Sequence, residues 1–158
     1  MSKITPCLWF EKEAEEAVNF YVSLLPDSRI DHIYTNVTEN PGGLPVGSVL
    51  MIEFTMGGQR FQALNGGVKF DSSMTVSLSY SCKDQTEVDR LWDGLSAGGQ
   101  EVECGWLTDR YGFAWQIVPD IMPKLLADPD REKAARAMKA MLTMKKLDIA
   151  TLERAARG

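Results

Sequence analysis

The chain of 158 residues contains a single histidine, His32, and three cysteines, and this scarcity limits the chemistry open to it. A Ser-His-Asp triad has little support, because no Gly-x-Ser-x-Gly motif accompanies the histidine. The cysteines, Cys7, Cys82 and Cys104, form no Cys-x-x-Cys pair and are odd in number. This pattern argues against a disulfide framework and against a structural zinc site. We interpret His32 as a structural or surface residue.

Phosphate-binding glycine motifs are also missing. The 13 glycines include four Gly-Gly pairs but no Gly-x-Gly-x-x-Gly and no Walker loop, so the usual cradle for a dinucleotide or a nucleoside triphosphate is absent. The glycine-rich loop that a Rossmann-type methyltransferase uses to hold its methyl donor is absent for the same reason. We expect a protein without a cofactor.

Neither charge of one sign nor a long hydrophobic run marks the chain. Lys and Arg number 17 against 22 Asp and Glu, and no block of like charge occurs, so we expect no nucleic-acid partner. No apolar run approaches the ~18 to 20 residues that cross a bilayer, and the first residues lack the zones of a signal peptide. The expectation is a cytoplasmic protein that binds no membrane.

The hydrophobic periodicity predicts the order β-α-β-β-β twice. In the first half we expect a strand over 4–10, a helix over 14–25, and strands over 30–37, 48–56 and 59–65. In the second half we expect a strand over 74–82, a helix over 84–97, and strands around 101–107 and 113–118. The sequence therefore indicates an α+β fold.

The two halves align as an internal repeat. An offset of 71 residues lays Glu16 on Glu87 within the strand-helix unit, whereas an offset of 54 lays Gln62 on Gln116 in the last strands. Duplication at this length predicts two βαβββ modules, about 1–67 and 68–120, whose sheets form one curved, cleft-lining domain over 1–120.

Residues 121–158 break the repeat and form a helical extension of the same domain. An apolar stripe that includes Met138 and Met141 lies at helical spacing, and Asp148 is placed to cap a final helix. The stripe packs either on the domain or on a partner subunit. We favour packing over a promiscuous binding surface.

Several segments together resemble one known family. They include Ile4–Phe10 with Glu15–Tyr21, then Cys104–Gly112, and Trp115–Pro119. The chain resembles, over nearly its whole length, the PhnB-like branch of the vicinal oxygen chelate superfamily, which includes glyoxalases, bleomycin-resistance proteins and extradiol dioxygenases. This branch carries the family label demethylubiquinone methyltransferase. The resemblance implies the two-module fold and a homodimer.

The resemblance also locates four positions that hold a metal ion in metal-using members of the superfamily. Here those positions are Pro6, Gln62, Ser77 and Gln116. These side chains supply no charge to hold a divalent ion against water, so we expect no metal. A slip of one residue in the alignment would bring Cys7 and Leu78 to the cleft in place of Pro6 and Ser77.

The same positions give the candidate ligand site. Gln62 and Gln116 are expected to face each other across the cleft as paired donors and acceptors, which suits an amide, a carboxylate or a carbonyl of a small molecule. The remaining candidates are polar contacts or apolar walls: Asn65, Ser77, Ser79, Phe70 and Trp106. A polar lining inherited from a metal-binding ancestor explains the same residues equally well.

Three functions remain open from the sequence. The first is a metal-independent small-molecule binding protein. The second is an enzyme, either a metal-assisted lyase, isomerase or dioxygenase or the methyltransferase of the family label, which is an analogy and not a property of the site. In the third, the cleft is vestigial, and the dimer surface with the Met-bearing extension is the functional part.

Two further candidates are weaker. Cys104 is a possible nucleophile, but no histidine lies in its segment to activate it, and we favour a packed thiol. Asp109 and Arg110 are a possible acid-base pair, but Asp-Arg-Tyr-Gly is also ordinary turn chemistry, and we favour the turn.

Trp92 lies at helical spacing with Val88 and is interpreted as core.

Overall fold

The protein is described from a computed structural model, which describes residues 2–158. Its contacts divide the chain into two compact units, Met1–Asp71 and Ser72–Gly158, here called unit 1 and unit 2. Unit 1 contains β1 (Cys7–Phe10), α1 (Ala14–Leu24), β2 (Arg29–Thr35), β3 (Val49–Met56) and β4 (Gln59–Asn65). Unit 2 contains β5 (Ser77–Cys82), α2 (Gln85–Ser96), β6 (Gln100–Glu101), β7 (Trp106–Thr108), β8 (Ala114–Pro119), α3 (Ile121–Leu126), α4 (Arg131–Met141) and α5 (Ile149–Arg157).

The two sheets have the same topology. The strand order is β1-β4-β3-β2 in unit 1 and β5-β8-β7-β6 in unit 2. In each sheet the first and last strands of the module pair in parallel, and the other pairs are antiparallel. The predicted α+β fold of two βαβββ modules with C-terminal helices is confirmed.

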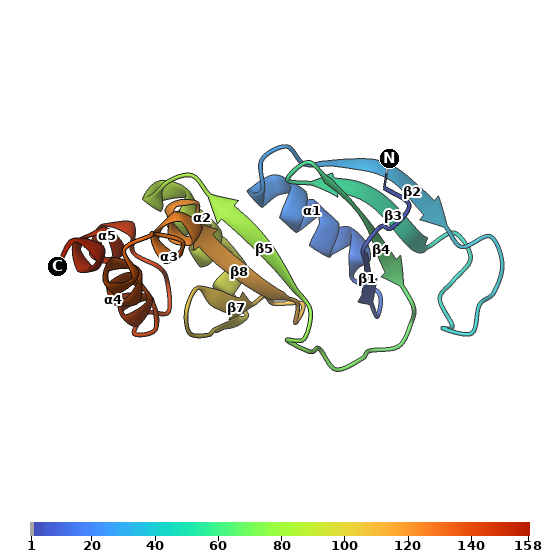
Figure 1. The fold of residues 1–158 in the computed structure, drawn as a ribbon. Coiled ribbons are helices and arrows are strands. Elements are labelled where there is room, and N and C mark those ends of the chain that lie inside the picture. The colour runs from blue at the N-terminus through green and yellow to red at the C-terminus, as the bar shows by residue number, and fades with distance from the viewer. Residues whose placement is uncertain (1) are drawn as a thin grey trace. The chain divides into compact units, whose positions relative to one another are not determined.

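One face of the sheet in unit 1 is buried beneath α1 (Figure 1). The helix buries Ala14, Ala17, Val18 and Tyr21, which lie three or four residues apart and therefore share one side. The strand residues buried on the same side are Leu8, Phe10, Ile52, Phe54 and Ala63. Because side chains alternate along a strand, Cys7, Trp9, Gln62 and Leu64 point to the other face.

Unit 2 repeats this arrangement with α2. The helix buries Val88, Leu91, Trp92 and Leu95, and the sheet contributes Leu107, Trp115 and Ile117. Trp92 is 2% exposed, and its indole Nε1 donates to Glu101 Oε1 at 2.8 Å. The interpretation of Trp92 as a core residue is confirmed.

The C-terminal helices α3, α4 and α5 pack within unit 2. Met122, Leu147 and Leu152 form a buried cluster, and Val118 at the end of β8 packs against it. Gln85 ties the segment before α5 to α2: its Nε2 donates to the carbonyl of Leu147 at 3.1 Å, and its Oε1 accepts from the N–H of Ile149 at 2.8 Å. Met141 of the predicted apolar stripe packs against this cluster, whereas Met138 of the same stripe is exposed, so the stripe packs only in part on the chain's own domain.

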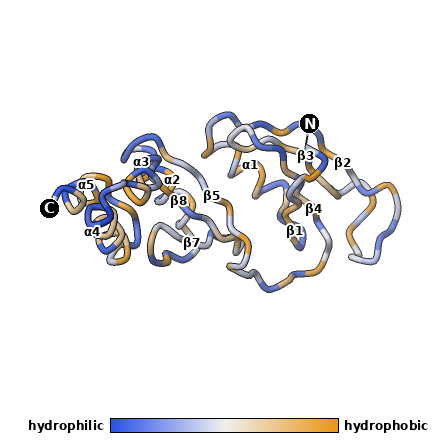
Figure 2. Tube along the Cα trace, in the orientation of Figure 1, coloured by the Kyte–Doolittle hydropathy of each residue, from blue (hydrophilic) through white to orange (hydrophobic). Residues whose placement is uncertain are grey.

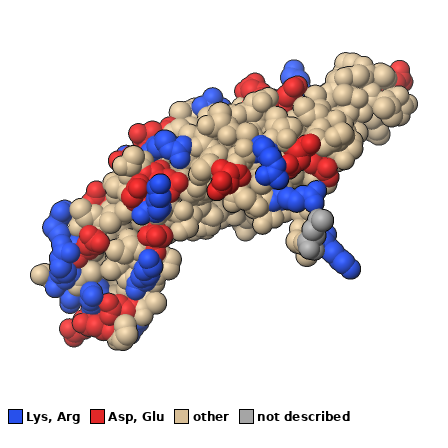
Figure 3. Space-filling model, turned by 90° about the horizontal axis from the view of Figure 1, so that it is seen from above, with Lys and Arg blue, Asp and Glu red and all other residues tan. Residues whose placement is uncertain are grey.

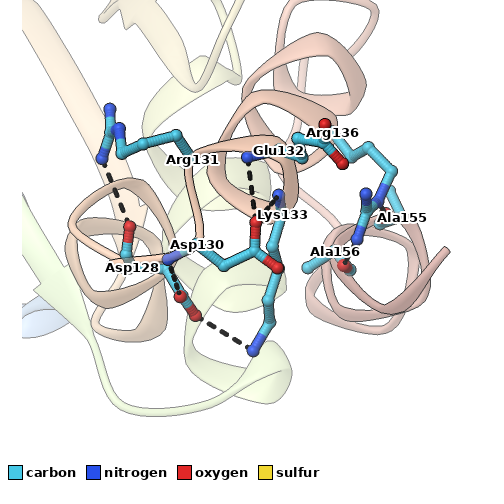
Figure 4. Close-up of polar contacts among 8 residues, drawn as sticks. All are labelled: Asp128, Asp130, Arg131, Glu132, Lys133, Arg136, Ala155 and Ala156. Atoms are coloured by element: carbon cyan, nitrogen blue, oxygen red, sulfur yellow. Dashed lines mark hydrogen bonds and ion pairs between the residues drawn. The ribbon is translucent and has the colours of Figure 1, made fainter.

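Arg136 of α4 holds the end of α5 (Figure 4). Its guanidinium donates from Nη2 to the carbonyl of Ala156 at 2.7 Å and from Nε to the carbonyl of Ala155 at 3.2 Å. The last carbonyls of a helix have no partner within the helix, so this fork supplies one from a neighbouring helix. Hydrophobic and hydrophilic residues alternate along these helices (Figure 2).

Helix α4 ends at Met141. The carbonyls of Met144 and Lys145 leave helical geometry and accept from the N–H groups of Cys104 and Gly105, at 2.8 and 2.7 Å. Cys104 has a φ of 60°, in the left-handed region, which turns its N–H toward this segment. These contacts between distant segments decide where the helix ends.

Candidate functional site

Helix α1 or α2 covers one face of each sheet. We call the other face, which the helix does not cover, the open face. In unit 1, Gln62 lies at the centre of this face, half-buried, between Cys7 on β1 and Glu53 on β3. The expectation that Pro6 occupies the first ligand position is wrong. The parallel register pairs Cys7 with Gln62, and Pro6 contributes only its carbonyl, which accepts from the N–H of Gln62 at 2.9 Å.

In unit 2, Gln116 occupies the matching position. It lies between Ser79 on β5 and Trp106 on β7, so these three side chains share the open face. The Gln116 amide donates from Nε2 to the hydroxyl of Ser77 at 3.0 Å. The structure therefore brings together four of the predicted site residues, Ser77, Ser79, Trp106 and Gln116.

The registers explain why the internal alignment slipped in one half. The residue beside Gln62 is Cys7, and the residue beside Gln116 is Ser79, so the first strands correspond with an offset of 72 residues. The helices, which begin at Ala14 and Gln85, correspond with an offset of 71. A difference of one residue is enough to exchange the two faces of a strand.

Phe70 lies at the end of unit 1 and is 64% exposed. Its ring centroid is 5.2 Å from that of Trp9, which is 39% exposed on the open face. Trp9 was not among the predicted site residues. The alternation of Leu8, Trp9 and Phe10 was the signal that could have identified it, because it places the indole opposite the two buried side chains.

Asn65 requires a correction. It is 5% exposed and lies on the face of the sheet beneath α1, beside Phe10. Its Oδ1 accepts from the N–H of Ala14 at 2.9 Å, and its Nδ2 donates to the carbonyl of Val49 at 3.0 Å. Both ends of the amide bind backbone. Asn65 therefore holds the start of α1, and its side chain does not lie with the other candidate ligand contacts.

The open face of unit 1 carries further polar residues that sequence reasoning did not select. The Tyr34 hydroxyl donates to Glu53 Oε2 at 3.1 Å, and the His32 ring lies edge-on to the Tyr34 ring with centroids 4.3 Å apart. The hydrogen bond to Glu53 raises the pKa of the Tyr34 hydroxyl, with further contributions from burial and from the carboxylate charge. His32 is exposed on β2, as a surface residue.

The donors at the four superfamily positions do not fit a divalent metal ion. The register puts Cys7 in place of Pro6 beside Gln62, and both Ser77 and Ser79 lie beside Gln116, so the donors are a thiol, hydroxyls and two glutamine amides. Burial raises the pKa of the Cys7 thiol and so disfavours the thiolate that binds metals. Within residues 2–158, no three His, Cys, Asp or Glu side chains gather in a way that could hold a metal ion.

The two weaker candidates take structural positions. Asp109 is 3% exposed, and its carboxylate accepts from the N–H groups of Tyr111 and Phe113 and from Trp115 Nε1, at 2.9 to 3.0 Å. The Asp-Arg-Tyr-Gly turn is thus confirmed. Cys104 is half-buried, and its backbone N–H binds the segment before α5 through the carbonyl of Met144.

Acidic and basic side chains are interspersed over the face of the molecule seen in Figure 3. No helix among residues 2–158 has the length and apolar character needed to cross a membrane. The expectation that Gln62 and Gln116 face each other joins the two units and stays a prediction.

Comparisons with known proteins agree with this fold. The sequence model of the 3-demethylubiquinone-9 3-methyltransferase family matches residues 2–118. The PhnB protein from Bacillus cereus is 33% identical, covering 75% of this chain and 99% of its own, with a TM-score of 0.66. Protein PA1353 from Pseudomonas aeruginosa is 20% identical, covering 76% and 98%, with a TM-score of 0.61, and shows the fold alone.

A glyoxylase/bleomycin resistance protein/dioxygenase domain from Frankia sp. EAN1pec also matches, with 17% identity over 73% of this chain and 94% of its own and a TM-score of 0.45. A comparison with curated proteins gave no match. Since the family model spans most of the chain and the Bacillus cereus protein matches over nearly its full length, this chain belongs to the 3-demethylubiquinone-9 3-methyltransferase family, the PhnB-like branch expected from the sequence.

Proposed function

We propose that the protein binds a small molecule on the open faces of its sheets, without a metal ion. The observation that carries the proposal is the repeated placement of a half-buried glutamine amide at the centre of each open face. Gln62 and Gln116 offer both donors and acceptors, and each lies on the strand next to one that carries a tryptophan, Trp9 or Trp106. Ligand sites combine such apolar walls with a few convergent polar groups.

The donor chemistry supports the metal-free form of this proposal. Thiol, hydroxyl and amide groups bring no fixed negative charge to the matched positions, whereas divalent ions in proteins are held mainly by carboxylates, imidazoles or thiolates. A homodimer in the cytoplasm, implied by the resemblance, belongs to the same proposal, and light scattering of the purified protein tests its oligomeric part.

The methyltransferase named in the family description is the alternative enzyme. The chain lacks the glycine-rich loop that holds the methyl donor in Rossmann-type methyltransferases, so this activity would need another donor site. Calorimetric titration with S-adenosylmethionine tests it directly. Saturable binding of one donor per chain would favour the enzyme over the binding protein.

The main experiment is a thermal-shift screen of small amides, carboxylates and aromatic carbonyl compounds, beside zinc, nickel, manganese and iron(II). We expect organic ligands to raise the Tm of the wild-type protein and to lose this effect in Gln62→Ala and Gln116→Ala. Asn19→Ala, on the exposed side of α1, is the control. Saturation by one metal ion per chain, or organic shifts that neither glutamine variant reduces, would overturn the proposal.

A further inference from the structure

Strand pairing arranges the open face of unit 1 into two adjacent rows that run across the strands. The register places Trp9, Leu64, Met51 and Tyr34 side by side, one from each strand, and we call this the apolar row. The neighbouring polar row consists of Cys7, Gln62, Glu53 and His32. Adjacent strands lie about 4.8 Å apart, so each row of four residues is about 14 Å long. Residues two apart on a strand are about 7 Å apart, which is the distance between the two rows.

The apolar row has a fixed aromatic anchor at one end. Trp9 Nε1 donates to the carbonyl of Val68 at 2.7 Å, which fixes the orientation of the indole. The ring lies directly on Gly66, where an added Cβ would come within 1.8 Å of it. Although it is held in this way, Trp9 remains 39% exposed, and the 64% exposed ring of Phe70 lies tilted beside it. Exposed aromatic rings that are held rigidly are suited to binding a flat apolar group.

Two strands away from Trp9, the polar row carries a carboxylate. Glu53 is half-buried and accepts the hydroxyl of Tyr34 at 3.1 Å. Among the ion pairs formed within residues 2–158, none includes Glu53. The nearest cation on this face is Arg60, which is exposed and lies opposite Thr55, one row further from the apolar row. By register Glu53 lies one row nearer to the apolar row than Arg60, and it binds the Tyr34 hydroxyl directly, whereas Arg60 acts on that hydroxyl only through its charge.

We propose that this face binds an elongated aromatic ammonium compound, with its ring on Trp9 and Leu64 and its ammonium group at Glu53. Because Trp9 and Glu53 lie two strands apart, the aromatic ring and the ammonium group of the ligand must be separated by about two strand spacings, roughly 10 Å. The Tyr34 ring beside Glu53 adds a cation-π contact to the ion pair. This inference rests on the proposed function and deepens it by naming the ligand class.

Three fluorescent probes with one naphthalene ring and one five-carbon chain test the charge. They are dansylcadaverine, which ends in an ammonium group, its neutral N-acetyl derivative, and N-dansyl-6-aminohexanoate, which ends in a carboxylate. By fluorescence titration, we expect the wild-type protein to bind the ammonium probe about tenfold more tightly than the other two. Tighter binding of the carboxylate probe would overturn the inference and assign the charged contact to Arg60.

Matched variants locate the two contacts. Glu53→Gln keeps an acceptor for Tyr34 and should bring the three probes to within about twofold of one another. Trp9→Leu should weaken all three by about tenfold, and Phe70→Ala, which alters only an exposed ring, should weaken all three to a smaller extent. Glu39→Gln, in an exposed loop of the same unit, should change nothing.

An unchanged preference in Glu53→Gln, or no binding of any probe to the wild-type protein, would overturn the ligand class. The proposed function would fall as well only if the thermal-shift screen gave no shift that depends on Gln62 and Gln116.

Discussion

The side chain of Asn65, at the end of β4, accepts a hydrogen bond from the backbone N–H of Ala14, the first residue of α1, at 2.9 Å. The residue before the helix, Glu13, provides no side-chain cap. An amide from a strand 51 residues further along the chain therefore supplies the acceptor that a helix start normally takes from its own cap. This bond fixes α1 on the sheet and leaves the other face open.

Replacement of Asn65 by alanine is expected to destabilise the protein by about 1 to 3 kcal/mol, because the Ala14 N–H and the Val49 carbonyl lose a buried partner. Urea denaturation followed by circular dichroism measures this change. Asn19→Ala removes an exposed hydrogen bond on α1 and should cost no more than about 0.5 kcal/mol. Equal costs for the two variants would contradict the capping role.

Asp109 should be more sensitive still. Asp109→Ala leaves the N–H groups of Tyr111 and Phe113 and the Trp115 indole without their acceptor, and we expect a loss of about 3 kcal/mol or more. Asp109→Asn keeps one oxygen and should lose less. Tryptophan fluorescence during urea unfolding checks both, with the exposed Asp71→Asn as control. A stable Asp109→Ala protein with altered ligand binding would instead support an acid-base role.

Gly66 should tolerate no side chain. A Cβ there would come within 1.8 Å of the Trp9 ring, so Gly66→Ala is expected to displace the indole and to cost about 1 to 3 kcal/mol. Near-ultraviolet circular dichroism reports the displacement. Gly43→Ala is the control, because its site is open and only its φ of 70° opposes alanine, at about 1 kcal/mol. An unchanged tryptophan spectrum in Gly66→Ala would rule out the close contact.

Stability is expected to fall in alkaline solution. Burial, followed by the charge of Glu87, raises the pKa of Cys82 from 9.0 to about 12 and that of Tyr80 from 10.0 to about 12. The unfolded chain thus loses these protons first, so unfolding becomes easier as the pH rises from about 9 toward 12, and the contribution is constant below pH 9. Denaturation midpoints between pH 8 and 11 should decline less in Cys82→Ala and Tyr80→Phe. An unchanged decline in both variants would contradict this assignment.

The helices and most strands could be predicted from periodicity because their buried residues recur at spacings that only one regular structure satisfies. The β4 strand and the start of α1 were located to the residue. The first strand was placed three residues too early, since Ile4 has strand propensity but is 82% exposed and outside the ladder. Strand pairing, which depends on a distant segment, decides where such an edge strand begins.

The candidate site was predicted less completely. Gln62, Gln116 and Trp106 lie on open faces and alternate with buried neighbours, and Ser77 and Ser79 alternate with the half-buried Leu78 and Tyr80, a pattern visible in the sequence. Asn65 is also a polar residue of β4, but it lies on the face covered by α1, where the first residue of α1 needs a hydrogen-bond acceptor. Glu53 and Tyr34 were identified only from the register between the strands, whereas the alternation of Leu8, Trp9 and Phe10 is a sequence signal for Trp9.

The sequence by itself determined the two βαβββ modules, the helical extension and the family, because hydrophobic periodicity and a repeated motif order are local properties. The tertiary structure decided which residue stands beside Gln62, where α4 ends and which polar side chains serve the backbone. Each of these depends on hydrogen bonds between segments tens of residues apart, and a shift of one residue in such a pairing exchanges the two faces of a strand.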